Sequence, residues 1–174
     1  EANMMGVAAG LAMSGLRPIC YTITPFITAR VYEQIKLDVC YQKLPVIIVG
    51  VGSGLSYAKL GPSHHSLDDI SLMRGLPNMR VLCPGDREET EALLREAMAH
   101  PGPTYIRLGK KNEPIIHDGL PELRIGKACV LESGSDICLL STGTILPEAV
   151  ELQKRLAGQG ISAELVSLHT VKPL

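Results

Sequence analysis

Several features that mark other classes of protein are missing from this chain. It contains no tryptophan, and Phe26 is its only phenylalanine, which excludes the aromatic stacking platforms of single-strand nucleic acid binders. Its 17 basic and 18 acidic residues give a formal net charge of -1, so nothing attracts the chain to nucleic acid or to an anionic membrane. No apolar run reaches the roughly 18 residues of a membrane span. We therefore expect small-molecule or protein partners, no nucleic acid and no membrane.

Disulfide and metal-binding patterns are also missing. The five cysteines are widely spaced, lie mostly in apolar runs and form no C-x-x-C pair; they are Cys20, Cys40, Cys83, Cys129 and Cys138. We interpret them as the reduced, buried thiols of a cytoplasmic protein. His64 and His65 are neighbours whose side chains point apart on an extended backbone, and no Cys, Asp or Glu nearby completes a plausible ligand set. No metal site is therefore predicted in this chain.

The glycine-rich stretch GVGSGLS, residues 50–56, matches none of the common short motifs. The third glycine of a dinucleotide fingerprint would fall on Leu55, and no serine is centred in a G-x-S-x-G elbow. The chain also has no Gly-Lys-Ser/Thr of a P-loop. Nucleotide binding through these motifs and serine hydrolase chemistry are therefore not predicted.

Helix-like and strand-like segments alternate along residues 1–108. Strands are expected over residues 17–24, 45–49, 80–83 and 103–108, and helices over residues 2–13, 26–42, 67–74 and from Asp86 onward. The strand PVIIV is wholly apolar, which is typical of a strand covered on both faces. Asp68, Asp69 and Asp86 are interpreted as helix caps, and Asp86 with Glu89 forms a capping box. We predict an α/β fold with a doubly wound, mostly parallel sheet.

Two of these helices carry specific expectations. Ile27, Val31, Ile35 and Val39 recur every four residues with charges between them, which predicts a continuous amphipathic helix over residues 26–42. The helix after Glu1 is apolar almost all round, so it is predicted to be buried, with its two glycines leaving room for close backbone packing.

The second part of the chain is predicted to begin another α/β domain. Residues 109–123 mix charges with proline and glycine and are predicted to link a first domain, residues 1–108, to a second that starts at residue 124. Strands are expected over residues 126–132, 136–141 and 161–168, and a helix over residues 146–157 with Ala149, Leu152 and Leu156 facing inward. The second domain is too short to close its own sheet. Because the sequence opens inside a helix and without a methionine, the first domain is expected to lack its N-terminal part.

Four side chains are candidates for chemistry. Glu1 faces the positive end of a helix dipole and is either an N-terminal cap or an acid that handles a coenzyme proton. His64 lies in a long loop after a strand, where open parallel sheets bind ligands, and either contacts substrate or only hydrogen-bonds the backbone. Arg107 and Lys110 flank the end of the fourth strand, where they either hold a phosphate or carboxylate or are solvated charges.

Five sequence blocks occur in consecutive order within residues 1–113. They are EANMMGVAAGLAMSG, QKLPVIIV, GPSHH, LPNMRVLCPGDREET and GPTYIRLG. Together they resemble the pyrimidine-binding domain of the transketolase family, which also includes 1-deoxyxylulose-5-phosphate synthases and the β-subunits of 2-oxo acid dehydrogenases. The remainder, ending in LHTVKPL, is similar to the start of the same family's C-terminal domain. The resemblance implies the thiamine diphosphate-binding fold of the pyrimidine type.

The resemblance also implies roles for individual residues. Glu1 would hydrogen-bond the ring nitrogen of the thiamine diphosphate aminopyrimidine and favour the imino tautomer that removes the thiazolium proton. Phe26 would lie against the pyrimidine with Arg30 nearby, although FITARVYEQ is one residue longer than the family's F-x-x-R-x-Y/F-D-Q pattern, which puts the register of Arg30 in question. His64 would contact a substrate oxygen, and Arg107 and Lys110 would bind an anionic end of the substrate.

Two departures and one missing motif refine this expectation. Leu60 replaces the acidic residue that usually precedes the GPTH motif, and no histidine stands near Gly52, so a substrate other than the standard pentose pair is implied. The family's GDG...N motif, which holds diphosphate and magnesium, does not occur in the chain. Magnesium is therefore expected on a diphosphate-binding partner domain or subunit, in a homo- or hetero-oligomer.

The sequence thus predicts the pyrimidine-binding half of a thiamine diphosphate-dependent, transketolase-like enzyme. It would transfer a two-carbon ketol unit to an aldehyde acceptor, using a small sugar or 2-oxo acid as substrate. One alternative is a 1-deoxyxylulose-5-phosphate synthase-like enzyme, which begins by decarboxylating pyruvate. The other is a non-catalytic subunit of such an assembly.

Overall fold

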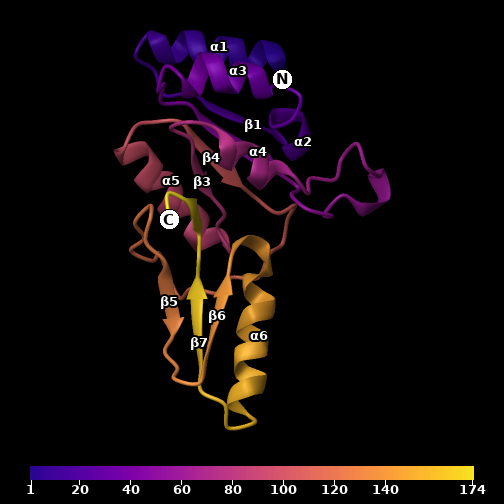
Figure 1. Cartoon of the computed structure of the whole chain (residues 1–174), viewed down its shortest axis with the longest axis vertical. Helices are drawn as coiled ribbons and strands as arrows, with labels where there is room; N and C mark the ends of the chain where they lie inside the picture. The colour runs from indigo at the N-terminus through magenta and orange to yellow at the C-terminus, as the bar shows by residue number, and fades with distance from the viewer.

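The computed structural model describes residues 1–174 and contains two sheets (Figure 1). The first part holds the strands β1 (Ile19–Ile23), β2 (Ile47–Val51), β3 (Arg80–Leu82) and β4 (Thr104–Arg107). Its helices are α1 (Ala2–Met13), α2 (Thr24–Ile27), α3 (Tyr32–Gln34), the π-helix η1 (Ile35–Cys40), the short η2 (Ala58–Leu60), α4 (Asp69–Gly75) and α5 (Arg87–Ala99). None of the helices in the chain combines the length and the apolar character that a membrane crossing requires.

The first sheet has the strand order β1-β2-β4-β3-β8. The pairs β1 with β2, β2 with β4 and β3 with β4 are parallel, and β8 (Thr170–Lys172) is antiparallel to β3. Side chains of β2 alternate between two cores: Ile48 packs with α1, η1 and α4, while Ile47 and Val49 pack with α5. Helices therefore cover both faces, and the predicted α/β fold with a doubly wound, mostly parallel sheet is confirmed.

The prediction of a continuous helix over residues 26–42 is wrong. The chain forms α2, then turns, α3 and η1. The Thr28 hydroxyl donates a 2.8 Å hydrogen bond to the Thr24 carbonyl, a back-bond that bends helices. Ile27, Val31, Ile35 and Val39 are nevertheless all buried. The last two lie in η1, whose turns are wider than the 3.6 residues of an α-helix and suit a spacing of four.

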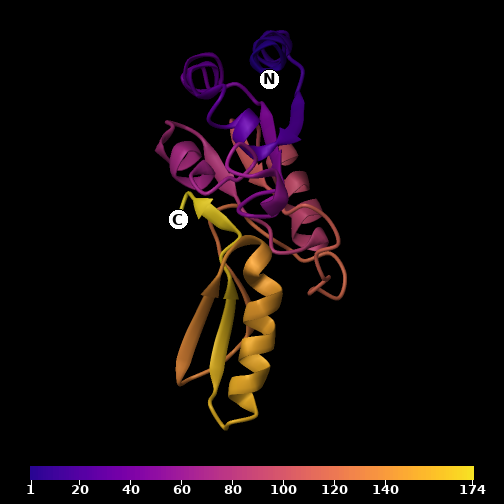
Figure 2. The same ribbon diagram turned by 90° about the vertical axis from the view of Figure 1, so that its right-hand side faces the viewer.

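The prediction that α1 is buried is also wrong, because only one side of this helix packs on the sheet. Met5, Ala8, Ala9 and Ala12 form the buried side. On the other side, Val7, Leu11 and Met13 are 53%, 41% and 56% exposed. Figure 2 shows α1 and the helix formed by α3 and η1 side by side at the end of the molecule away from the second sheet.

The second sheet has the order β5-β7-β6 and carries a single long helix on one face (Figure 1). It consists of β5 (Cys129–Glu132), β6 (Ile137–Ser141) and β7 (Ala163–Ser167), with the short η3 (Gly143–Ile145) before α6 (Leu146–Ala157). The helix forms where predicted, but Leu152 is 45% exposed, and the fully buried leucine is Leu146. The chain then returns to the first sheet as β8, which the sequence did not predict.

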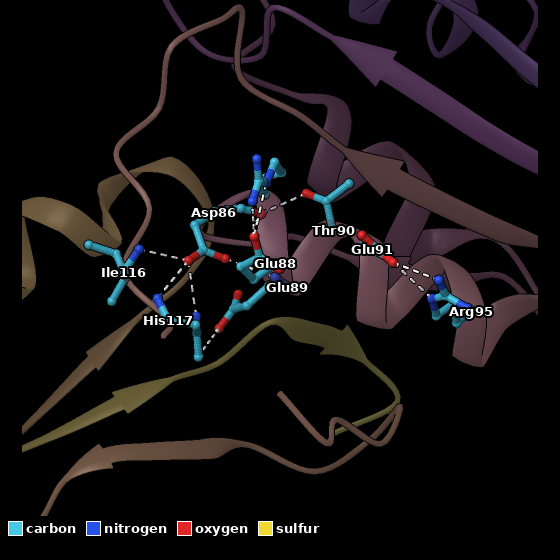
Figure 3. Close-up of polar contacts among 9 residues, drawn as sticks. Asp86, Glu88, Glu89, Thr90, Glu91, Arg95, Ile116 and His117 are labelled. Carbon is cyan, nitrogen blue, oxygen red and sulfur yellow. Dashed lines mark hydrogen bonds and ion pairs between the residues drawn. The ribbon is translucent and has the colours of Figure 1, made fainter. Parts of the chain in front are cut away.

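Asp86 joins the start of α5 to the segment 109–123 (Figure 3). One carboxylate oxygen caps α5 by accepting from the Glu89 backbone N–H at 2.8 Å. The other accepts from the Ile116 N–H at 2.8 Å, the His117 N–H at 3.0 Å and His117 Nδ1 at 3.0 Å. Since a carboxylate only accepts hydrogen bonds, His117 carries its proton on Nδ1. The predicted cap is confirmed, and it also anchors the segment that follows β4.

Glu89 and two histidines complete this buried junction. Glu89 Oε2 accepts from the Gly85 N–H at 2.7 Å, and Oε1 lies 3.7 Å from His117 Nε2. Burial raises the pKa of Glu89 and lowers the pKa of His169 to about 4. A Cβ on Gly85 would lie 2.4 Å from Leu146 Cδ2, so α6 packs directly against the turn before α5.

We predict that Asp86→Asn destabilises the folded chain by about 2–4 kcal/mol. The new amide nitrogen would face three N–H donors of Ile116 and His117 that now bind one carboxylate oxygen. Urea unfolding followed by circular dichroism measures this loss. Glu89→Gln is the matched control, because the amide oxygen still accepts from Gly85 while the buried charge is removed, so a change below about 1 kcal/mol is expected. Equal losses in both variants would contradict the prediction.

The effect of Asp86→Asn is expected to depend on pH. Burial alone would raise the pKa of Asp86, but the backbone N–H groups of Glu89, His117 and Ile116 together hold it below its ordinary value of 3.8. The stabilisation is therefore complete above that value and is lost as the pH falls through the lower pKa of the folded state. The difference in unfolding free energy between wild type and variant should shrink in acid; a difference that grows would contradict this assignment.

Candidate functional site

Glu1 stands at the N-cap position of α1, but its side chain makes no capping hydrogen bond. Its Oε2 lies 2.7 Å from Arg30 Nη1, and its Oε1 accepts a long hydrogen bond of 3.4 Å from the Thr22 hydroxyl. The interpretation of Glu1 as a side-chain cap is therefore wrong. Its side chain is 20% exposed, so the carboxylate sits at the surface of the sheet edge and is open to a ligand.

Arg30 reaches Glu1 because the helix breaks after α2. The turn that follows α2 brings the guanidinium of Arg30 over the ring of Phe26, with 4.4 Å between Cζ and the ring centroid. The residue added to the FITARVYEQ segment is thus accommodated in a turn. Glu1, Arg30 and Phe26 form one contiguous group.

His64 is held between two aromatic rings. Its centroid lies 5.1 Å from that of Phe26 and 6.1 Å from that of Tyr57, both edge-on. Its Nδ1 is 3.0 Å from the Ser63 hydroxyl. The interpretation of His64 as a histidine that hydrogen-bonds the backbone is not what the structure shows. The ring is fixed from three sides, and Nε2 is left available to a ligand.

Tyr57 is a member of this group that the sequence analysis missed. The Nζ of Lys110 lies 4.8 Å from the centroid of its ring. A single aromatic residue in a glycine-rich loop gives no periodic signal. The row of contacts therefore runs from Glu1 through Arg30, Phe26, His64 and Tyr57 to Lys110.

Arg107 lies apart from this row in an ion pair. Its Nε is 2.8 Å from Asp69 Oδ2, with side-chain exposures of 16% and 1%. The same oxygen accepts from the Tyr105 hydroxyl at 2.7 Å. Burial and the charge of Asp69 raise the pKa of Tyr105, which keeps the hydroxyl protonated as a donor. Arg107 is therefore not a solvated charge, and Asp69 is not a cap; Asp68 occupies the N-cap position of α4 without a side-chain capping bond.

The candidate residues come from segments that follow parallel strands of one sheet. Phe26 and Arg30 follow β1, Tyr57 and His64 follow β2, and Lys110 follows β4. This edge is where open parallel sheets bind ligands. Chemically, it offers a carboxylate next to an aromatic ring, an imidazole with one free nitrogen, and an exposed ammonium. No group of three or more His, Cys, Asp or Glu side chains is arranged to hold a metal ion.

The cysteines contribute little to this site. Cys20, Cys40 and Cys83 are buried, as predicted, and burial raises the pKa of each thiol. Cys129 is half-buried and Cys138 is exposed, which corrects the expectation for these two residues, and none of the five forms a disulfide.

Comparison with known proteins shows the same two parts along the chain. Residues 1–114 match the family model described as "Transketolase, pyrimidine binding domain", and residues 126–174 match "Transketolase, C-terminal domain". The 6-deoxy-6-sulfo-D-fructose transketolase subunit SqwH of Clostridium sp. (strain MSTE9) is 42% identical over 99% of this chain and 54% of its own length. A 1-deoxy-D-xylulose-5-phosphate synthase of Acidobacterium capsulatum is 39% identical over 100% of this chain and 28% of its own length.

Solved structures show the same fold. A protein described as "Split gene transketolase, inactive beta4 tetramer" superposes with a TM-score of 0.90 at 36% identity, covering 99% of this chain and 56% of that one. A transketolase of Pichia stipitis superposes with a TM-score of 0.88 at 24% identity, covering 98% of this chain and 26% of that one. The chain spans about half the length of SqwH and of the split-gene protein.

We predict that Asp69→Ala destabilises the chain by about 3–5 kcal/mol, because it leaves the guanidinium of Arg107 without its counter-ion and the Tyr105 hydroxyl without its acceptor. Urea unfolding gives the loss. Asp68→Ala is the matched control, since the neighbouring carboxylate is exposed and makes no capping bond, and it should change the unfolding free energy by less than about 0.5 kcal/mol. Comparable losses would show that the Asp69 ion pair is not structural.

Proposed function

The chain belongs to the transketolase family, and we propose that it is the pyrimidine-binding half of a thiamine diphosphate-dependent enzyme that transfers a two-carbon ketol unit to an aldehyde. The observation that carries this proposal is the placement of Glu1. Its carboxylate stands at the sheet edge next to the Phe26 ring, is not used as a cap, and contacts a partly exposed arginine. This is a carboxylate that a heterocyclic ring nitrogen can reach.

The residues present fit the pyrimidine end of thiamine diphosphate. Glu1 would hold a proton at the ring nitrogen, and Phe26 would give the ring an apolar surface. When bound, the cofactor supplies the carbon nucleophile that attacks the donor carbonyl. Glu1, Phe26 and Arg30 are the proposed cofactor-binding residues. Glu1 and His64 are the proposed catalytic residues, and Nε2 of His64 would hydrogen-bond a substrate oxygen.

The diphosphate end is proposed to lie on a partner. We propose that magnesium and the diphosphate are bound by another domain or subunit. The open side of α1 supports such a partner, because Val7, Leu11 and Met13 are exposed there and a Cβ on Gly6 or Gly10 would meet no atom within 4 Å. Exposed apolar patches of this kind mark association surfaces. The family's split-gene relative, described as an inactive β4 tetramer, agrees with a chain that needs its partner for activity.

The proposed substrate is a ketose with an anionic group, handled in the cytoplasm. The named relatives include subunits for 6-deoxy-6-sulfo-D-fructose and for apulose 4-phosphate, whose substrates carry a sulfonate or a phosphate. Lys110 is free of ion pairs at the proposed site and is suited to such a group. For Arg107, whose Nε is paired with Asp69, we propose a contact through the remaining guanidinium nitrogens.

A second candidate function is 1-deoxyxylulose-5-phosphate synthase-like condensation, which the identity of 39% to the Acidobacterium capsulatum enzyme favours. The two functions use different donors. We predict that the assembled enzyme forms a new ketose from a ketose phosphate and an aldehyde without releasing carbon dioxide. Product analysis by mass spectrometry with pyruvate in a parallel reaction decides between them; carbon dioxide release from pyruvate would favour the synthase. A non-catalytic subunit would give no product from either donor.

We predict that Glu1→Gln slows hydrogen–deuterium exchange at the thiazolium carbon by about 100-fold or more in the assembled enzyme with thiamine diphosphate and magnesium. The amide cannot exchange a proton with the ring nitrogen, although it retains the size of the side chain. Exchange is followed by proton NMR after quenching in acid. Glu33→Gln, an exposed glutamate of α3, is the control and should leave exchange unchanged. Wild-type exchange rates in Glu1→Gln would overturn the catalytic assignment.

A further inference from the structure

The ring of Tyr57 packs against Gly52 in the loop that follows β2. A Cβ on Gly52 would lie 1.9 Å from Tyr57 Cε2 and 2.5 Å from Cδ2, so the ring packs directly on the backbone of Gly52. Gly52 also has a φ of +74°, a conformation that favours glycine. The tyrosine ring thus fills the space that a side chain at position 52 would take.

This part of the loop is fixed to the sheet edge. The Gly52 N–H donates to the Gly109 carbonyl at 2.9 Å, and the Ser53 N–H donates to the Leu108 carbonyl at 3.1 Å. These bonds connect the loop after β2 to the segment that carries Lys110. The position of the Tyr57 ring relative to Lys110 is therefore set by the backbone of two strands.

Tyr57 lies between two residues of the proposed substrate site. One is Lys110, whose Nζ is 4.8 Å from the ring centroid, and the other is His64, whose ring is 6.1 Å away at an interplanar angle of 67°. An aromatic face attracts an ammonium but does not neutralise it as a carboxylate would. No carboxylate is within ion-pair distance of Lys110. The ammonium is thus oriented by the ring and keeps its charge for an anion.

We propose that Tyr57 is a positioning residue that holds Lys110 to bind the anionic group of a ketose substrate, at a fixed place relative to His64. This inference rests on the proposed function for the identity of the substrate, but the anion site itself does not depend on turnover. The chemistry it recognises is a tetrahedral oxyanion at the end of a small polar molecule, either a phosphate or a sulfonate. The Tyr57 hydroxyl makes no hydrogen bond within the chain, so the aromatic ring carries the positioning role.

The first test measures anion binding without catalysis. Inorganic phosphate and methanesulfonate are titrated into the assembled enzyme by calorimetry, which distinguishes the two kinds of anion. Lys110→Met should weaken binding of the preferred anion by about 10-fold or more. Tyr57→Leu removes the aromatic face and should weaken it by about 2- to 5-fold. Tyr57→Phe keeps the ring and should bind like wild type, as should Lys59→Met, the control at an exposed lysine in the same loop.

The second test separates positioning from a general structural role. With D-fructose 6-phosphate as donor, Tyr57→Leu should raise KM while kcat changes by less than about 2-fold, and Tyr57→Phe should restore KM. With neutral D-fructose as donor, the loss of kcat/KM in Tyr57→Leu should be smaller than with D-fructose 6-phosphate, because only the phosphorylated donor uses the anion site. A thermal melt confirms that each variant is folded.

The outcomes keep the two proposals apart. If wild type binds neither anion, or if Tyr57→Leu and Lys59→Met bind equally, the inference is overturned even where transfer activity is present. If wild type binds an anion through Lys110 and Tyr57 but shows neither ketol transfer nor exchange at the thiazolium carbon, the inference stands and the proposed function fails. Equal loss with D-fructose and with D-fructose 6-phosphate in Tyr57→Leu would overturn the positioning role.

Discussion

The parallel pairing of β1, β2, β4 and β3 is the constraint on which the rest of the structure depends. Strands that run in one direction end at one edge, so the segments after them meet there. Hydrogen bonds between neighbouring segments then fix their positions. Thr24 Oγ1 donates to the Val51 carbonyl at 3.0 Å, and the Gly52 N–H donates to the Gly109 carbonyl at 2.9 Å. The candidate site is therefore assembled from loops whose starting points are rigid, although the loops themselves are exposed.

The same sheet also joins the two parts of the chain. β8 pairs with β3, and α6 packs through Leu146 against Gly85, which lies just after β3. Asp86 follows directly and binds the N–H groups of Ile116 and His117. Buried carboxylates are costly unless they are hydrogen-bonded, and here the bonds come from two separate segments, the first turn of α5 and residues 116–117. These contacts consequently hold the second sheet in a defined position at the edge of the first sheet opposite β1.

The α/β alternation and the cap at Asp86 could be predicted from the sequence, because each depends on local pattern. The roles of Glu1, Phe26, Arg30 and His64 were implied only by the resemblance to the transketolase family, since Glu1, Phe26 and His64 lie far apart in the sequence and no local pattern joins them. The break after α2 could not be predicted, since an apolar spacing of four residues also fits a continuous amphipathic helix. The ion pair of Arg107 with Asp69 joins residues 38 positions apart. The pairing of β8 with β3 could not be predicted either, because no local sequence pattern indicates that the chain returns to the first sheet.

The contact of Arg30 with both Glu1 and Phe26 bears directly on how the site would work. The guanidinium now covers the aromatic face and one carboxylate oxygen, the two surfaces that a pyrimidine ring is proposed to use. The Arg30 side chain is 54% exposed, and ion pairs exposed to this degree contribute little to stability because water competes for both charges. A ring that brings its own nitrogen to Glu1 can therefore move the guanidinium off the carboxylate at small cost, which leaves Arg30 free to contact the cofactor itself. Until then, the arginine pairs with the carboxylate and holds it beside the Phe26 ring.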